Sequence, residues 1–141
     1  MKSTASAHWS GGLKDGSGTI STKTGALRDV PYNFAQRFEG AEGSNPEELI
    51  GAAHSACFSM ALAGQLGAAG MTAEAIDTTA TVTLEKVDGD FSVTKVHLDL
   101  TAKIPGADEA KFREAAEGAK AGCPISRLLK AEVTLDAKLA S

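Results

Sequence analysis

The chain has 141 residues, of which 43% are hydrophobic and 23% are charged, and its formal net charge at pH 7 is −4. This length suits one compact domain over residues 1–141 that folds without a disulfide or a metal, so its two cysteines are not a scaffold. The Lys and Arg residues form no basic block, which argues against a nucleic-acid partner. The N-terminal segment lacks the apolar stretch of a secretory signal, so we expect a cytoplasmic protein.

The first third of the chain has the composition of short strands and turns. Its residues are rich in Gly, Ser and Thr, and residues 17–22 (SGTIST) are typical of a small strand. The pattern changes at Asn45, which is a good N-cap, with Pro46 at the first helical position and Glu48 where a capping box needs it. We therefore predict that a helix begins here and runs to the Gly-Ala-Ala-Gly segment at residues 67–70.

Small or apolar residues surround nearly the whole circumference of this helix, which is the pattern of a helix buried on all sides. Residues 49–66 are long enough to raise the question of a membrane span, but His54 and Gln65 interrupt them and Glu47 stands just before them. We therefore expect no membrane segment. A domain of this size has few layers to cover such a helix, so we predict that part of it packs on a second copy, in a homodimer.

The second half of the chain alternates strand and helix patterns. Residues 76–84 alternate as a half-buried strand, and a turn at Asp88-Gly89 leads to a second strand at 91–104, whose phase slips near Thr94-Lys95 as at a bulge. Two helices and a final strand follow, at residues 108–120, 124–130 and 133–139. This order predicts an α+β fold with antiparallel sheet, and not a doubly wound parallel sheet.

Cys57 and Cys123 are the first candidates for chemistry, although free cysteines are most often buried and inert. Cys123 lies between Gly122 and Pro124, at the expected cap of a short helix, where a thiolate is favoured. Cys57 lies about three turns inside the buried helix, where burial raises a thiol pKa, so it needs a nearby cation to react. Local electrostatics alone would therefore make Cys123 the better thiolate.

Arg28 and Arg37 are the candidates for that cation, and Glu47 is a candidate for its partner. Arg37 is flanked by phenylalanines, which argues for partial burial, and a buried guanidinium favours a carboxylate partner. Taken singly, Arg37 is more simply a surface cation and Glu47 a helix N-terminal charge.

His54, Cys57 and Cys123 could also bind a metal, but no CxxC or HxxxH motif accompanies them. We interpret His54 as a hydrogen-bonded helix residue.

Residues 45–60 (NPEELIGAAHSACFSM) closely resemble the OsmC branch of the OsmC/Ohr family of thiol-dependent peroxidases. The likeness covers nearly the whole chain through residues 7–9 (AHW), 37–40 (RFEG), 121–126 (AGCPIS) and 130–135 (KAEVTL). It implies an OsmC-like fold, in which antiparallel sheets wrap around a buried central helix in an intertwined homodimer.

The resemblance also implies an activity and the roles of four residues. Members of the family reduce organic hydroperoxides and, to a lesser degree, hydrogen peroxide. Cys57 is similar to their peroxidatic nucleophile and Cys123 to the resolving thiol that closes a disulfide. Arg37 is similar to the cation that stabilises the thiolate, and Glu47 to the carboxylate that orients this arginine. An external dithiol, on a lipoylated partner protein, would reopen the disulfide, and neither a bound cofactor nor a metal is required.

The spacing of Glu47 and Cys57 along the predicted helix bears on whether one chain can form the site alone. Glu47 and Cys57 are ten residues apart on one predicted helix, which is about 15 Å along its axis. If the helices of two subunits run antiparallel, Glu47 of one can approach Cys57 of the other, and the active site is shared. The resemblance assigns the first attack to Cys57 against the local electrostatics, and we follow it. The alternative function is a non-catalytic module that binds a small apolar ligand beside the helix.

Overall fold

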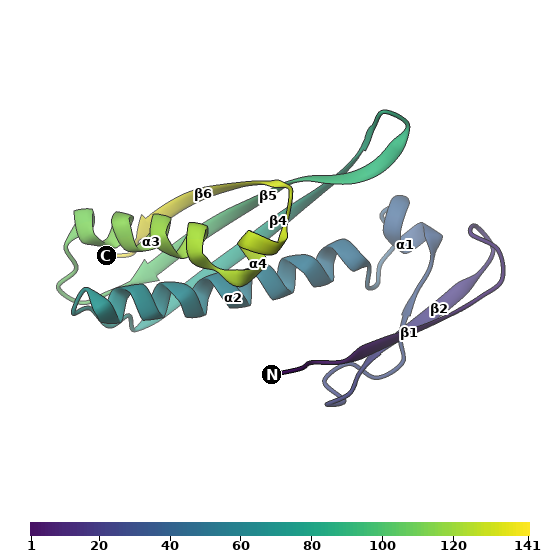
Figure 1. The fold of residues 1–141 in the computed structure, drawn as a ribbon, viewed down its shortest axis with the longest axis horizontal. Coiled ribbons are helices and arrows are strands. Elements are labelled where there is room, and N and C mark those ends of the chain that lie inside the picture. Colours follow the sequence, from purple (N-terminus) through teal and green to yellow (C-terminus); the bar gives the residue numbers. More distant parts are fainter. The chain divides into compact units, whose positions relative to one another are not determined.

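The computed structural model describes all residues from Met1 to Ser141, and the chain divides into two compact units (Figure 1). The N-terminal unit is Met1–Leu49 and the C-terminal unit is Ile50–Ser141. Each unit has its own three-stranded sheet, with the strand orders β1-β2-β3 and β4-β5-β6. The expectation of a single domain over residues 1–141 stays a prediction.

An antiparallel sheet makes up most of the N-terminal unit. Its strands are β1 (Ala5–Ser10), β2 (Ser17–Thr22) and β3 (Val30–Tyr32), so the strand expected at residues 17–22 is confirmed. The Trp9 and Tyr32 rings meet over Gly18, with their centroids 5.4 Å apart. A Cβ at Gly18 would lie 2.6 Å from the Tyr32 ring and 2.8 Å from the Trp9 ring, so only glycine fits between them.

The N-terminal unit has no hydrophobic core of its own. None of its apolar side chains is fully buried, and Leu13 is 67% exposed. After the sheet, the short helix α1 (Phe34–Phe38) begins at Asn33, whose side chain accepts a hydrogen bond of 2.9 Å from the Gln36 N–H. The unit therefore consists of a sheet and one helical turn with little apolar burial to stabilise them.

Helix α2 (Pro46–Ala68) begins as the capping signal predicts. The Asn45 side chain accepts a hydrogen bond of 2.8 Å from the Glu48 N–H, which satisfies one of the free donors of the first turn. In this chain α2 buries one side only, so the expectation of burial all round is not met within a single copy. The buried side carries Gly51, His54, Phe58, Leu62 and Leu66.

The opposite side of α2 is a solvent-exposed row of small and apolar residues, here called the exposed α2 stripe: Ala52, Ala56, Met60, Ala63 and Gly67. Met60 in the middle of the stripe is 79% exposed. By length and composition α2 is also the one helix that could cross a membrane, a test that core helices of water-soluble proteins pass as well. The stripe shows that one copy of the chain leaves this helix half covered.

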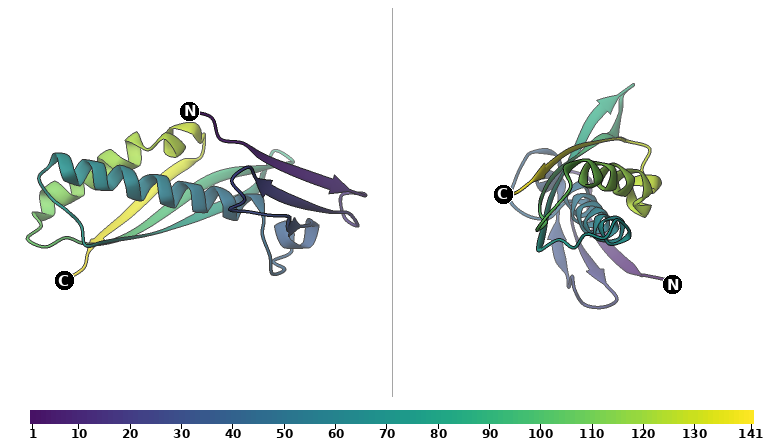
Figure 2. Two further views of the ribbon diagram at one scale, coloured as in Figure 1. Left: turned by 90° about the horizontal axis from the view of Figure 1, so that it is seen from below. Right: turned by 90° about the vertical axis from the view of Figure 1, so that its left-hand side faces the viewer.

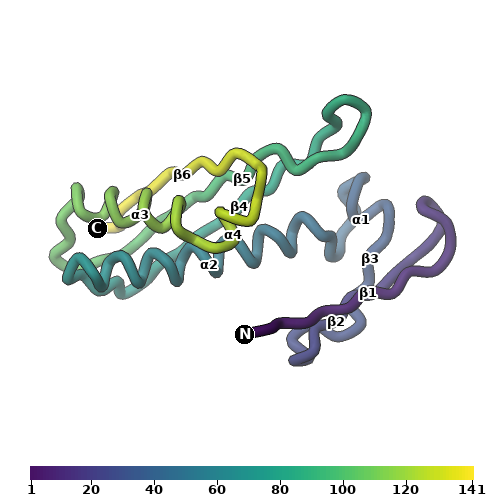
Figure 3. Tube along the Cα trace, in the orientation of Figure 1, coloured from purple at the N-terminus to yellow at the C-terminus, as the bar shows by residue number.

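A long hairpin dominates the sheet of the C-terminal unit. Strands β4 (Ala75–Val87) and β5 (Asp90–Lys103) pair antiparallel and are joined by Asp88 and Gly89, both at positive φ, as a type I′ turn requires. Thr83 pairs with Lys95 and Leu84 with Val93, so Thr94 is the extra residue of the predicted bulge. Beyond this bulge the hairpin runs past the end of its neighbouring strand (Figure 3).

The last strand corrects the prediction of purely antiparallel sheet. Strand β6 (Glu132–Leu139) pairs with β5 in parallel, from Lys95 opposite Glu132 to Ala102 opposite Leu139. A parallel pair needs a long crossover connection, and helices α3 (Glu109–Gly122) and α4 (Pro124–Leu128) supply it. The sheet is mixed, and the α+β class is confirmed.

Helices α2 and α3 lie side by side on one face of this sheet (Figure 2). Alternate residues of β5 point toward them, as the period of a strand requires. The fully buried members of the resulting core come from α2, β5 and α3: Phe58, Leu62, Leu66, Val96, Leu98, Ala102, Phe112, Ala116 and Ala119. This core fixes the part of α2 that carries Cys57 against the segment that carries Cys123.

Candidate active site

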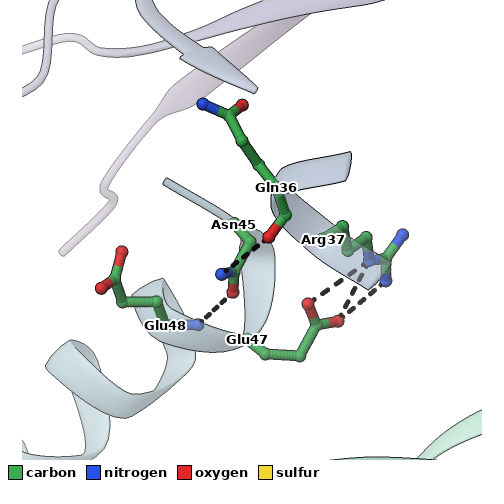
Figure 4. Close-up of polar contacts among 5 residues, drawn as sticks. All are labelled: Gln36, Arg37, Asn45, Glu47 and Glu48. Atoms are coloured by element: carbon green, nitrogen blue, oxygen red, sulfur yellow. Dashed lines mark hydrogen bonds and ion pairs between the residues drawn. The ribbon is translucent and has the colours of Figure 1, made fainter. Parts of the chain in front are cut away.

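Arg37 and Glu47 form an ion pair within the N-terminal unit (Figure 4). One terminal nitrogen of Arg37 donates to Oε1 at 2.9 Å, and its Nε lies 3.2 and 3.3 Å from the two carboxylate oxygens. The Glu47 side chain is 11% exposed, whereas the Arg37 side chain is 39% exposed. A buried carboxylate therefore fixes a guanidinium whose outer side is open, and the fork-shaped contact sets its direction.

The residues around this ion pair hold its two helices in place. Asn45 caps α2 with its side-chain oxygen, and its amide nitrogen donates to the Gln36 carbonyl of α1 at 3.4 Å (Figure 4). The Gln36 amide in turn donates to the Glu42 carbonyl at 3.0 Å. Asn45, identified from the sequence as a cap only, thus also ties the turn that carries Arg37 to the start of the helix that carries Glu47.

A hollow of about 290 Å³ lies next to Arg37 in the same unit. Its walls are mostly aromatic and apolar: Trp9, Leu13, Tyr32, Asn33, Phe34, Arg37 and Phe38. The Arg37 guanidinium lies 5.1 Å from the centroid of the Phe38 ring. This hollow can accept an apolar group whose polar end faces the guanidinium.

Cys57 and Cys123 meet in the C-terminal unit although 66 positions separate them in the sequence. Both are free thiols, with their sulfur atoms 2.7 Å apart in a hydrogen-bonding contact. Cys57 is partly exposed, whereas Cys123 is fully buried. Cys123 ends α3 and caps α4, so the predicted cap position is confirmed. The geometry suits a disulfide formed within one chain.

The two thiols differ in acidity. Burial raises the pKa of Cys57, and the contact with Cys123 raises it further. Burial also acts to raise the pKa of Cys123, but interactions with Cys57, with the backbone of Ser126 and Ile125 and with the Ser126 hydroxyl outweigh it and lower this pKa. These shifts make Cys123 the more acidic thiol, as the sequence indicated, and none of the groups that shift the pKa of Cys57 is a cation.

His54 lies one turn before Cys57 and is fully buried. Its Nε2 is 2.7 Å from the Ser126 hydroxyl, which confirms its interpretation as a hydrogen-bonded helix residue, and its Nδ1 has no partner. Burial lowers the pKa of this imidazole. Sequence reasoning missed Ser126, although a serine three residues after a capping cysteine occupies a capping-box position and could have been noticed.

The metal alternative on His54 and the two cysteines finds no support, because these three side chains do not bring their ligand atoms together in a compact group. A compact group of metal-ligating side chains lies elsewhere, on the polar face of the C-terminal sheet, where His97 is 3.4 Å from Asp99 and 3.2 Å from Asp136. Both carboxylates are exposed, and the group is explained as a cluster of polar side chains on the surface.

Residues 39–138 match the family described as OsmC-like protein. Peroxiredoxin OsmC of Escherichia coli (strain K12) is 56% identical over 135 residues, which cover 96% of this chain and 94% of that protein. Among solved structures, the organic hydroperoxide resistance protein OhrB of Bacillus subtilis matches with a TM-score of 0.68 at 27% identity, over 97% of this chain and 98% of its own. An OsmC protein of Legionella pneumophila shares the fold with a TM-score of 0.70 at 24% identity, over 100% and 98% of the two chains.

Proposed function

Since this chain belongs to the OsmC family, we propose that it is a thiol peroxidase that reduces organic hydroperoxides to alcohols, and hydrogen peroxide to water. The observation that carries the proposal is the meeting of Cys57 and Cys123, with 2.7 Å between their sulfur atoms. The 56% identical relative is a peroxiredoxin by name, and OhrB is named for resistance to organic hydroperoxides. We place the protein in the cytoplasm, where its thiols stay reduced between turnovers.

The reaction uses the four residues in sequence. The Cys57 thiolate attacks the terminal oxygen of the hydroperoxide, the O–O bond breaks, and the alkoxide leaves and takes up a proton. Arg37 stabilises the Cys57 thiolate and the leaving oxygen, and Glu47 orients Arg37. Cys123 then attacks the Cys57 sulfenic acid, closes the disulfide and releases water. A dithiol, which we propose to be a lipoyl group on a partner protein, reopens this disulfide by exchange, without a bound cofactor or metal.

The hollow beside Arg37 fits the substrate class. An organic hydroperoxide has an apolar body and one polar end. The apolar body suits the aromatic walls, which are formed by Trp9, Tyr32, Phe34 and Phe38, and the polar end suits the Arg37 guanidinium. Hydrogen peroxide has no apolar body to occupy this space. The preference for organic hydroperoxides therefore follows from the walls of the hollow.

The protein acts as a homodimer with shared active sites. Two surfaces support this: the exposed α2 stripe, whose small apolar residues suit close packing of a second copy, and the N-terminal unit, which buries no apolar side chain of its own. Glu47 and Cys57 are about 15 Å apart along α2, so the Arg37–Glu47 pair of one copy serves the thiols of the other. The guanidinium so supplied is the cation that Cys57 lacks in its own chain.

The peroxidase proposal is tested by consumption of cumene hydroperoxide in the presence of dihydrolipoamide. We expect turnover by the wild type, none by Cys57→Ser, and dimedone labelling of Cys57 in Cys123→Ser after one equivalent of peroxide. Labelling of Cys123 in Cys57→Ser, with none of Cys57 in Cys123→Ser, would exchange the two roles. No consumption by the wild type would favour the non-catalytic module for apolar ligands.

The shared site is tested by mixing inactive variants. Arg37→Ala and Cys57→Ser chains, unfolded and refolded together, should regain activity, because each mixed dimer then contains one intact site, or about a quarter of all sites in an equal mixture. Arg37→Ala with Glu47→Gln is the matched control, because both changes fall in the same half of the site and leave every site of a mixed dimer damaged. Equal activity of the two mixtures would contradict a shared site.

A further inference from the structure

Ser126 and His54 form a buried pair beside the two thiols that the four-residue mechanism does not use. The His54 imidazole, on α2, is fully buried, and its Nε2 lies 2.7 Å from the Ser126 hydroxyl, on α4. Ser126 is the third residue after Cys123, which caps the same helix, and its backbone and hydroxyl are among the groups that lower the Cys123 pKa. The pair therefore joins the helix of Cys57 to the helix of Cys123.

The position of the hydrogen on His54 follows from burial. Because burial lowers its pKa, the imidazole is neutral and carries one N–H. Its Nδ1 is buried without a partner, and an unpaired acceptor is tolerated in protein interiors more readily than an unpaired donor. The hydrogen therefore belongs on Nε2, which donates to the Ser126 oxygen. The hydroxyl hydrogen of Ser126 is then free to point to the Cys123 sulfur.

We propose that His54 and Ser126 are positioning residues for Cys123: the imidazole orients the serine hydroxyl so that it donates to the Cys123 thiolate. The proposal rests on the peroxidase cycle described above and deepens it. The lowered pKa of Cys123, to which the Ser126 hydroxyl and backbone contribute, agrees with this arrangement. Cys123 is fully buried and would otherwise favour its neutral form.

The pair acts at two steps of the cycle. In the first, the Cys123 thiolate attacks the Cys57 sulfenic sulfur, the S–S bond forms, the S–O bond breaks, and the oxygen leaves as water with a proton from solvent. In the second, a thiolate of the external dithiol attacks Cys57, which is partly exposed, and the S–S bond breaks with its electron pair on Cys123. A more acidic leaving thiol departs faster, so the serine hydroxyl speeds reduction and directs it to Cys57.

Few other charged groups act on Cys123. Cys57 contacts it from α2, and Ser126 and Ile125 act on it from α4. Lys120 of α3 forms an ion pair with Glu117, and Arg127 of α4 is exposed. A change in the pH dependence of Cys123 chemistry after substitution of Ser126 can therefore be assigned to the loss of its hydroxyl.

The first test is a single turnover, in which reduced protein is mixed with one equivalent of cumene hydroperoxide, quenched over time and analysed by mass for Cys57 sulfenic acid and disulfide. At about pH 6, Ser126→Ala should close the disulfide about threefold more slowly for each tenfold loss of thiolate, because weaker acids make stronger nucleophiles. At a pH high enough for both proteins to carry the thiolate, the difference should reverse, because the less acidic thiol of Ser126→Ala is then the stronger nucleophile, by about threefold for each tenfold difference in acidity. The sulfenic acid should accumulate only at the lower pH.

Conservative variants separate positioning from structure. Ser126→Thr keeps the hydroxyl, and His54→Gln keeps an N–H donor near the place of Nε2, so both should close the disulfide nearly as fast as the wild type. His54→Leu should be as slow as Ser126→Ala. Ser59→Ala is the matched control. It removes a half-buried hydroxyl on α2 that is hydrogen-bonded to Thr78 at 2.8 Å, and it should not change the rate of disulfide closure.

The second test starts from the oxidised protein and needs no peroxide. Reduction of the disulfide by dithiothreitol should be slower in Ser126→Ala than in the wild type, and unchanged in Ser59→Ala. Equal slowing of closure at both pH values, or no slowing at either, would overturn the positioning role. A wild type that forms no sulfenic acid and no disulfide would instead overturn the peroxidase cycle itself, so the two failures are distinguishable.

Discussion

The two units of this chain differ in how they are stabilised. The C-terminal unit has a continuous core in which Phe58, Leu98 and Phe112 are fully buried, whereas the N-terminal unit buries no apolar side chain to that extent. A unit of 49 residues that is built on a three-stranded sheet and has no core is marginal by itself. The C-terminal unit can hold its thiols in place alone, and the N-terminal unit needs a further surface to pack against.

The chemistry is divided in the same way. The C-terminal unit holds Cys57 and Cys123 in contact but offers Cys57 no cation, and burial raises the pKa of this thiol. The N-terminal unit offers Arg37, fixed by Glu47 and open on its outer side, but no thiol. The well-packed unit thus contains the atoms that must meet at bonding distance, and the poorly packed unit contains the charge that acts through space.

The largest effect that we expect is on the core of the C-terminal unit. Phe58→Ala should lower the free energy of unfolding by about 3–5 kcal/mol, because it leaves a cavity among α2, β5 and α3. Phe91→Ala is the matched control on the hairpin, where the ring is 52% exposed, and should cost less than about 1 kcal/mol. Urea unfolding followed by circular dichroism measures both. Similar costs for the two would contradict a core confined to the helices and the face of the sheet beneath them.

Much of this fold could be predicted because helix caps and bulges leave signals in a short stretch of sequence. Asn45 caps α2 and Thr94 forms the bulge, as predicted, since each depends on a few neighbouring residues. The prediction of antiparallel sheet was wrong for β6, because side chains alternate in the same way in parallel and antiparallel strands. That direction is set by the crossover through α3 and α4, which periodicity does not encode.

The site was less predictable than the fold. The sequence placed Arg37 and Glu47 as candidates, but their contact depends on how α1 turns back onto the start of α2, which Asn45 and Gln36 arrange. Ser126 was missed because a serine near the start of a helix is common and gives no periodic signal. Its importance becomes visible only when α4 is placed against the buried His54.

The next largest effect that we expect is on the rate of the reaction, to which the N-terminal unit contributes the charge of Arg37. We expect Arg37→Ala to lower kcat/KM for cumene hydroperoxide by about 10²–10³-fold, since it removes the charge that stabilises the thiolate and the leaving oxygen. Arg37→Lys should recover part of this, because it keeps the charge but loses the fork that fits Glu47. Arg28→Ala is the matched control, since that guanidinium contacts only the Gly25 carbonyl among the hydrogen bonds of its turn. An unchanged rate in Arg37→Ala would remove the N-terminal unit from the chemistry.

The smallest effect that we expect is a pH dependence of the free energy of unfolding that arises in the C-terminal unit. Burial lowers the pKa of His54 below its usual 6.5 in the folded C-terminal unit, so the unfolded chain binds a proton more readily than the folded one. The contribution of neutral His54 is therefore fully present above about pH 6.5 and is lost as the pH falls toward its folded value, by at most about 1.4 kcal/mol per pH unit. Unfolding in urea at several pH values should show a steeper loss on acidification in the wild type than in His54→Gln, which has no proton to bind. The other two histidines, His8 and His97, are the same in both proteins, so parallel curves would show that His54 is not held neutral by the core.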